Sequence, residues 1–474
     1  MKHFKTFLVI IFVWIPILLP SCRPETDDSY PEIDIYVYNF SQIFESFWHG
    51  MNRNYLYWDS EPVSSLWLPV FVDLPSGLRS NINNDPMAFW DIMYDHYKPK
   101  FDALGEIPLA NLPSSPAAQT AYDLFAEMTS GLCDGNFKIV MEDGRIIWPA
   151  NNRREAGYNA EPFPWASGVF FYSDLTDINA DLSVDYTDQS AYFRTYNFVD
   201  NVIKNYFAPL YDYEVIKDIS AGDSTFDDTN FRFVRGTIPH TNGGKILYLS
   251  SNYCLLFPLY NDIEDAYERF LDDLDDSDVK GIIMDLRGNV GGSLYDIGFF
   301  WGRIVDASLT YSETRAKSGE GRLEYGPWIP NRILPAPEGE KTLASSDAKI
   351  VFLVDGGTAS TAELMTMAAK AYENAVIVGT STFGAANSSA SEGNNTAYNG
   401  GAFRVDHFIE YAGGAEVQNR DVIDKKIYEG AGIEPDIEVE MTEADWLNFY
   451  GQTGTARDKQ LERAIKEIDP SRNF

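Results

Sequence analysis

A serine at the start of a predicted helix is the residue in this sequence best placed to act as a nucleophile. Residues 351–354 form a short apolar run, as expected of a strand buried on both faces, and an Asp-Gly-Gly turn follows it. Small residues from Thr358 onward open a helix, and Ser360 lies in the loop that leads into it. Backbone N–H groups at a helix N-terminus lack intrahelical partners, so they can hold the charge of an oxyanion. Serine also caps helices commonly, so a capping role for Ser360 is the alternative.

A glycine-rich turn after another buried strand is the second feature that could do chemistry. The strand is predicted over 279–286, and the turn has the sequence Asp285-Leu286-Arg287-Gly288-Asn289-Val290-Gly291-Gly292. Glycines at such a position let the backbone approach a ligand closely. One interpretation is a phosphate-binding loop, but the GxxxxGKS/T pattern with its lysine is missing. The other is a loop whose N–H groups face a reacting carbonyl, and then this turn and Ser360 should converge on one pocket.

Four motifs, in order, resemble those of the tail-specific or C-terminal-processing serine peptidases, a family that includes the tricorn core and the repeats of interphotoreceptor retinoid-binding protein. The motifs are DLRGNVGG (285–292), TASTAE (358–363), TFG (382–384) and GAGIEPDI (430–437). The resemblance implies an α/β (α+β) fold, with a crotonase/Clp-like β-α superhelical peptidase core and a small helical N-terminal domain. The segment at 47–59 is similar to the helical domain of secreted members from gut bacteria of the Bacteroides type.

The resemblance also implies roles for individual residues. Ser360 matches the nucleophile, and the Thr361 N–H, together with the N–H of Gly291 or Gly292, would form the oxyanion hole. Such an arrangement suits acyl transfer, in which negative charge develops on the carbonyl oxygen. Val290 stands where the family usually has glycine, and the larger residue is expected to stiffen the loop.

The general base is missing from both positions where the family carries one. One branch of the family has lysine after the TFG motif, where this sequence has Ala385, and another has histidine after an Asp-Gly pair, where it has Asn136. Neither side chain can accept a hydroxyl proton, and that transfer is worth roughly 10²–10⁴ in rate. His240, in a loop, and His407, on a predicted strand, are the candidates for a replacement base. Glu363 is expected to cap the turn of Ser360.

Two functions are compatible with these motifs. The first is a serine endopeptidase that cuts extended polypeptides through Ser360 with a non-standard base. The second is a catalytically impaired pseudopeptidase that binds a peptide or an apolar ligand. A net charge of −34 over 474 residues disfavours nucleic acid and anionic membrane surfaces as partners. Neither a cofactor nor a metal is expected.

The first 22 residues resemble a bacterial lipoprotein signal. Lys2 and Lys5 precede an apolar stretch over 7–19 that is too short to span a membrane, and Cys22 follows as the expected lipidated residue. A plain secretory signal with an incidental cysteine is the alternative. Acidic residues just after Cys22 resemble surface-export tags of Bacteroides-group lipoproteins. The protein is therefore expected to be exported and lipid-anchored to the outer membrane, at the cell surface or the periplasmic face.

Composition and periodicity divide the rest of the chain into five consecutive parts. They are a polar tether (23–37), a helical N-terminal domain (38–144), an intermediate region without the carboxylate-binding loop of a PDZ domain (145–244), the peptidase core (245–445) and closing helices (446–474). Residues 308–345 are too long for a plain connection and are predicted to form a flap or hairpin. Cys133 and Cys254 are two buried thiols or one disulfide, and their spacing leaves both open.

Overall fold

The structure is a computed structural model of the 474-residue chain. It describes residues 39–59, 86–105, 115–149, 213–220, 230–344, 347–387, 402–405, 408–442, 445 and 457–474. The predicted signal with Cys22, the tether at 23–37 and His407 lie outside the described residues. None of the helices in the described part is long and apolar enough to cross a bilayer.

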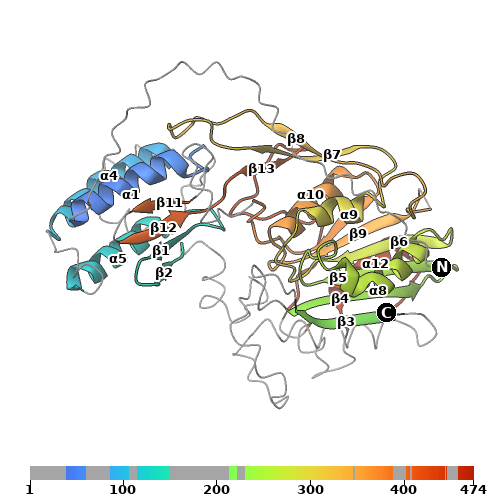
Figure 1. The fold of residues 1–474 in the computed structure, drawn as a ribbon. Coiled ribbons are helices and arrows are strands. Elements are labelled where there is room, and N and C mark those ends of the chain that lie inside the picture. Colours follow the sequence, from blue (N-terminus) through green and yellow to red (C-terminus); the bar gives the residue numbers. More distant parts are fainter. Residues whose placement is uncertain are drawn as a thin grey trace, which may run out of the picture. The chain divides into compact units, whose positions relative to one another are not determined.

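A seven-stranded sheet forms the centre of the core. In spatial order its strands are β14 (Ile437–Glu438), β10 (Ala375–Gly379), β9 (Lys349–Val354), β6 (Val279–Asp285), β5 (Lys245–Ser251), β4 (Asn230–Pro239) and β3 (Tyr213–Ser220). Neighbouring strands from β14 to β5 are parallel, and β4 and β3 extend the sheet antiparallel (Figure 1). The mixed α/β class is as predicted. The sheet, however, begins before residue 245, because the hairpin of β4 and β5 joins part of the predicted intermediate region to the core.

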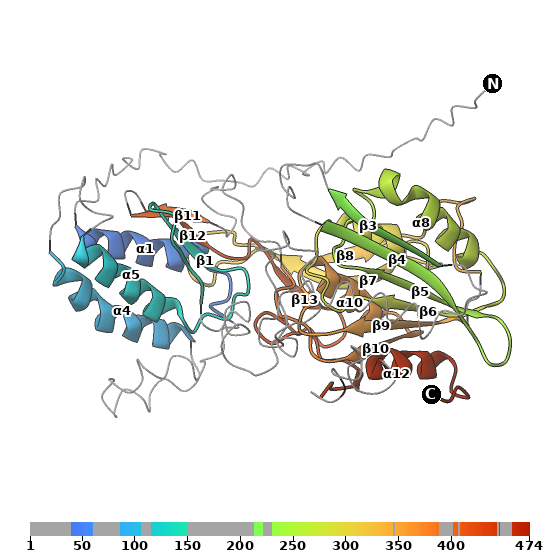
Figure 2. The ribbon, with the colours of Figure 1, turned by 90° about the horizontal axis from the view of Figure 1, so that it is seen from below.

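Helices cover both faces of this sheet. α8 (Tyr260–Leu274), α9 (Tyr295–Trp301) and α10 (Thr361–Ala371) pack on one face, and α12 (Lys459–Ile468) packs on the other. Figure 2 shows α12 beside β9 and β10, with α8 on the opposite side of the sheet. Along β6, Ile282 and Met284 belong to the first core and Ile283 to the core under α12. This alternation is that of a strand with both faces buried, and it explains the continuous apolar run.

Among the described residues, three helices and a four-stranded sheet form the N-terminal part. The helices are α1 (Phe40–Asn54), α4 (Pro86–Asp102) and α5 (Pro116–Thr129), as their apolar spacing predicts. The sheet order is β11 (Phe403–Val405), β12 (Ile409–Gly413), β1 (Lys138–Met141) and β2 (Ile146–Ile147). Of these strands, β11 and β12 come from the segment predicted as core. They join this sheet because β12 pairs antiparallel with β1. The N-terminal part is therefore completed by chain from beyond residue 400.

The hairpin predicted over 308–345 is present. β7 (Leu309–Arg315) pairs antiparallel with β8 (Ile329–Ile333), and β13 (Gln418–Asp421) pairs with the other edge of β7. Residues at its tip contact the segment that follows α1. Arg322 Nε donates to Asn52 Oδ1 at 2.7 Å, and the Tyr325 hydroxyl donates to the Leu56 carbonyl at 2.7 Å.

Cys133 and Cys254 are buried thiols that are not joined in a disulfide. Cys254 Sγ lies 3.5 Å from Asn289 Oδ1 and 3.8 Å from Met365 Sδ. Cys133 Sγ lies 4.0 Å from the Tyr55 hydroxyl. Each cysteine therefore packs in its own part of the molecule.

Candidate active site

Hydrogen bonds join the glycine-rich turn to the turn that carries Ser360. β6 and β9 are neighbouring parallel strands, so the loops that follow them leave the sheet side by side. Leu286 N donates to the Leu353 carbonyl at 2.8 Å, and Thr358 Oγ1 donates to the Leu286 carbonyl at 2.8 Å. Ala359 N donates to the Asn289 carbonyl at 2.9 Å. Two motifs that are far apart along the chain thus form one local structure.

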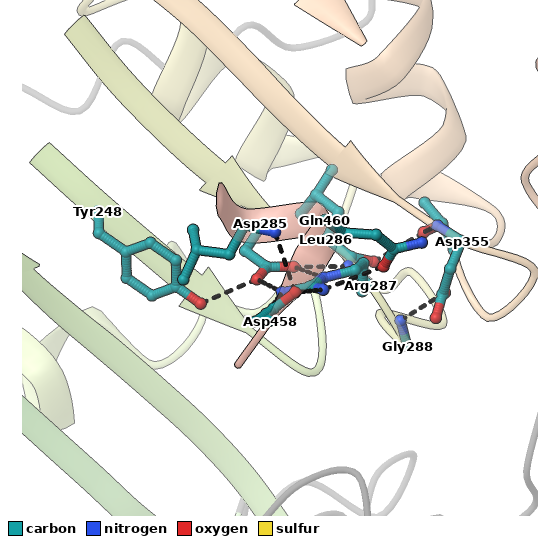
Figure 3. Close-up of polar contacts among 10 residues, drawn as sticks. Tyr248, Asp285, Leu286, Arg287, Gly288, Asp355, Asp458 and Gln460 are labelled. Atoms are coloured by element: carbon teal, nitrogen blue, oxygen red, sulfur yellow. Dashed lines mark hydrogen bonds and ion pairs between the residues drawn. The ribbon is translucent and has the colours of Figure 1, made fainter. Parts of the chain in front are cut away.

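A buried ionic network holds the start of the glycine-rich turn (Figure 3). The Arg287 guanidinium donates to Asp285 at 2.7 and 3.0 Å and to Asp458 at 2.8 and 3.0 Å. It also donates to Gln460 Oε1 at 3.0 Å, and the Tyr248 hydroxyl donates to Asp285 Oδ2 at 2.9 Å. Burial disfavours the guanidinium charge, but the two carboxylates outweigh it and raise the pKa of Arg287 well above its ordinary value. The network therefore ties the turn to the first turn of α12.

Ser360 stands at the N-terminus of α10 in a strained backbone conformation. Its φ is 55° and its ψ is −123°, a combination that is costly for a residue with a side chain. A sharp strand-to-helix turn of this kind is a known way to present a nucleophile. Gly291 lies directly against it, because a Cβ added to Gly291 would be 2.6 Å from Ser360 Cβ and 2.9 Å from Thr361 N. The two predicted segments meet at this point.

Of the predicted oxyanion donors, Gly292 and Thr361 have their N–H groups available for a ligand. Gly291 N already donates to Asn289 Oδ1 at 2.9 Å, so the geometry selects Gly292 from the two predicted glycines. Neither Gly292 N nor Thr361 N donates to any other residue that the structure describes. Thr361 Oγ1 donates to the Gly292 carbonyl at 2.8 Å, which fixes one residue relative to the other.

Glu363 joins the serine turn to the loop that follows β10. One carboxylate oxygen accepts from Ser360 N at 3.2 Å and from Ala385 N at 2.8 Å. The other accepts from Thr382 Oγ1 at 2.6 Å and from Gly384 N at 2.8 Å. Burial raises the pKa of Glu363, and these hydrogen bonds oppose the shift. Both oxygens are thus occupied, in keeping with the predicted capping role rather than a role as base.

The two positions where a base was expected lie next to each other beside this turn. Ala385 is fully buried and packs with Ala359, Phe383 and Val290. A Cβ added to Gly135 would lie 2.8 Å from Ala385 Cβ, so the loop that contains Asn136 adjoins it. The Asn136 side chain donates from Nδ2 to the Asn387 carbonyl at 3.1 Å. Neither an alanine nor an asparagine here can accept a proton from a serine.

Comparison with known proteins gives a family match for the part of the chain that contains this site. Residues 255–439 match the model of Peptidase family S41. This part of the chain is therefore similar to Peptidase family S41. The match agrees with the predicted resemblance to tail-specific serine peptidases over this part of the chain.

Peptidases and peptidase candidates are among the solved structures that resemble this chain. A peptidase candidate from Parabacteroides merdae is 16% identical, with a TM-score of 0.54 over 91% of this chain and 96% of its own. Mature CPAF is 13% identical, with a TM-score of 0.46 over 86% and 93%. An S41 protease candidate from Bacteroides fragilis is 17% identical, with a TM-score of 0.32 over 54% and 72%. The first of these shows a shared fold; a search of curated proteins finds no match.

His240 is not brought to the Ser360 site, which corrects the expectation that it could act as the base. It precedes β5, at the amino ends of the parallel strands, whereas Ser360 follows the carboxyl end of β9. A strand of six residues such as β9 spans roughly 20 Å. His240 Nε2 lies 3.3 Å from the Ile468 carbonyl and 3.8 Å from Asp469 Oδ1, at the end of α12. Of the two predicted histidines, only His407 remains a candidate.

A buried polar cluster beside Asn136 was not foreseen. Glu429 accepts from Gly135 N at 2.8 Å and from the side-chain amide of Asn387, and that amide also contacts the Tyr57 hydroxyl. Burial, and next the negative charge of Asp134, raise the pKa of Glu429 well above its ordinary value. Glu429 belongs to the segment before the GAGIEPDI motif, but nothing local in the sequence indicates its contact with residue 135. The described residues contain no group of acidic, histidine or cysteine side chains arranged to hold a metal.

Proposed function

We propose that the S41 domain acts on extended polypeptides as a serine-type peptidase, with Ser360 as the nucleophile. The observation that carries this proposal is the pair of N–H groups of Gly292 and Thr361, which flank Ser360 and donate to no other described residue. Folded proteins pair nearly all of their inward-facing backbone N–H groups. Two such donors beside a hydroxyl therefore suit the carbonyl oxygen of a ligand.

The proposed reaction is acyl transfer followed by hydrolysis. The carbonyl oxygen of the scissile bond accepts hydrogen bonds from Gly292 N and Thr361 N. The Ser360 oxygen attacks the carbonyl carbon while its proton passes to a base, and the C–N bond breaks as the leaving amine takes up a proton. Water then hydrolyses the ester, which releases the carboxylic acid and restores the hydroxyl. The network around Arg287 contributes by holding the turn in place before the ligand arrives.

A second candidate function is peptide binding without hydrolysis. It is favoured by Asn136 and Ala385, which fill the two positions where the family carries a base. A serine hydroxyl without a base is a weak nucleophile. The carbonyl-binding donors do not depend on that base, so binding would persist where hydrolysis is lost.

A fluorophosphonate probe distinguishes the two functions, because it forms a covalent bond only with an activated serine. For a peptidase, we expect labelling of the wild type, loss of labelling in Ser360→Ala, and unchanged labelling in the control Ser308→Ala, whose serine is exposed in the loop before β7. His407→Ala should then lower the labelling rate by about 10²-fold or more if His407 is the base. Absence of labelling in a folded wild type that still binds peptide would establish the second function instead.

The proposed location is the outer membrane, to which a lipid on Cys22 would anchor the protein. The support is the order of a basic segment, a short apolar segment and Cys22 at the start of the sequence. Metabolic labelling with a palmitate analogue should mark the wild type and leave Cys22→Ser unmarked. Equal labelling of both would contradict the proposal.

A further inference from the structure

We propose that Phe257, Leu294 and Tyr295 form an apolar subsite that receives a large apolar side chain of the polypeptide, next to its bound carbonyl. This inference rests on the proposed function, since it takes the N–H groups of Gly292 and Thr361 as the place where the carbonyl binds. It adds a substrate class to that function: polypeptides with a residue such as Phe, Leu or Met beside the bound carbonyl.

The three side chains are placed near the oxyanion donors by their connection to the loop that carries Gly292. Leu294 and Tyr295 come two and three residues after Gly292, where α9 begins. Gly292 forms an isolated parallel bridge with Cys254, and Ser293 N donates to the Cys254 carbonyl at 2.7 Å. Phe257 follows Cys254 by three residues, so both segments that carry the subsite are attached directly to the oxyanion turn.

The three side chains are unusually exposed for their size, and the two aromatic rings lie together. Phe257 is 48% exposed, Leu294 53% and Tyr295 72%. The rings of Phe257 and Tyr295 have centroids 5.3 Å apart, and Phe257 also contacts Phe299 edge-on at 5.6 Å. Single exposed apolar residues are common, but a cluster of this kind beside a polar site marks a binding surface.

A buried carboxyl group holds this surface in place before any ligand binds. Asp296 is fully buried in α9, and its oxygens accept from Leu256 N at 2.8 Å and from Phe257 N at 2.9 Å. The carboxyl group therefore couples the Phe257 segment to the helix that carries Tyr295. A ligand side chain would meet a preformed platform, which lowers the entropic cost of binding.

Chemistry and charge indicate which ligand the subsite receives. The subsite consists of two aromatic rings and one aliphatic side chain, so it offers apolar contact rather than an ion pair. The net charge of −34 opposes the approach of an acidic peptide and leaves neutral or basic polypeptides as the favoured ligands. A neutral polypeptide segment with one large apolar side chain fits both the subsite and the adjacent carbonyl donors.

Fluorescence anisotropy with two labelled peptides tests the subsite. Both are ten-residue peptides of Gly, Ser and Asn, and one of them has a single central Phe in place of Ser. Binding is measured in the Ser360→Ala background, so that cleavage cannot interfere. We expect the Phe peptide to bind roughly tenfold more tightly, because burying one aromatic side chain is favourable. Leu294→Ser and Tyr295→Ser should remove this preference, Tyr295→Phe should keep it, and the control Ile423→Ser, 59% exposed elsewhere, should not change it.

Three results would overturn the inference. They are equal affinities for the two peptides, an equal loss of the preference in Ile423→Ser, or conversion of a dimer to a monomer by Tyr295→Ser, which would make the surface an interface between two copies. The proposed hydrolysis can be refuted independently of the subsite. If the fluorophosphonate does not label Ser360 while the Phe preference persists, only hydrolysis is refuted. If labelling occurs without the preference, only the subsite is refuted.

Discussion

Replacing Gly291 by alanine would test whether its close approach to Ser360 shapes the site. The added Cβ would lie 2.6 Å from Ser360 Cβ, 2.8 Å from the Ala359 carbonyl oxygen and 2.9 Å from Thr361 N. Two of these atoms belong to the backbone and cannot rotate away. Gly291 also has a φ of 93°, which a residue with a side chain rarely adopts. The substitution therefore adds backbone strain and displaces the turn that carries the nucleophile.

Gly288→Ala is a matched control, because it adds strain without a clash. Gly288 has a φ of 69°, and an added Cβ there would meet no atom within 4 Å. Backbone strain costs about 1–2 kcal/mol in either variant. The crowding at Gly291 adds about 1–3 kcal/mol, as for other overpacked sites. We therefore expect urea unfolding to show a loss of about 1–2 kcal/mol for Gly288→Ala and about 2–5 kcal/mol for Gly291→Ala.

The labelling rate of Ser360 should distinguish the two variants more clearly than the free energy of unfolding does. A displacement of about 1 Å at a reacting group can cost on the order of 10²-fold in rate. The fluorophosphonate labelling rate should therefore fall at least about tenfold in Gly291→Ala and stay within about twofold of wild type in Gly288→Ala. Equal losses of stability and of labelling in the two variants would refute the argument, since then the φ angle alone would explain both.

Three further predictions concern the base, the ionic network and the buried acid of α9. Asn136→His should raise peptide hydrolysis by about 10²-fold or more over wild type, because it supplies a proton acceptor beside the serine turn; no increase in a folded variant would contradict this. Asp458→Ala should destabilise the protein by about 3–5 kcal/mol in urea unfolding, because it removes one carboxylate from buried Arg287, and a loss below about 1 kcal/mol would contradict the role of the network. Burial raises the pKa of Asp296 from 3.8 to about 7, so the folded state binds more protons than the unfolded state between these values. Stability should therefore decrease as pH rises through this window, and Asp296→Asn should flatten that dependence in melting curves, whereas an unchanged slope would exclude Asp296 as its source.

The elements of the core were predictable wherever the signal is local. The apolar run at 351–354 predicted the strand β9, and the pattern at 446–474 predicted closing helices, of which the structure describes α12. The pairing of β12 with β1 and the addition of β3 and β4 to the sheet were not predictable, because strand pairing depends on contacts between distant segments. Domain boundaries drawn along the chain therefore misplace segments that return to an earlier part of the fold.

In the site, too, local sequence signals were predictive, whereas most contacts between distant segments were not. The convergence of Gly291 with Ser360 could be expected, because the loops after neighbouring parallel strands leave the sheet at the same edge. The choice between Gly291 and Gly292 required the geometry, since only the structure places Asn289 Oδ1 on the N–H of Gly291. The contact of Glu429 with Gly135 joins residues 294 positions apart and leaves no local signal.

The buried acids explain how the site can be stable without a cationic base. Glu363 and Glu429 accept hydrogen bonds only from backbone, hydroxyl and amide donors among the described residues, and burial raises the pKa of both. These hydrogen bonds satisfy the carboxyl oxygens of both buried acids without a positive charge at Ala385 or Asn136. A histidine introduced by Asn136→His would change this arrangement, because its imidazolium form would favour the carboxylate of Glu429. The pKa of Glu429 should then fall, so the substitution that supplies a base would also create the charge that orients it.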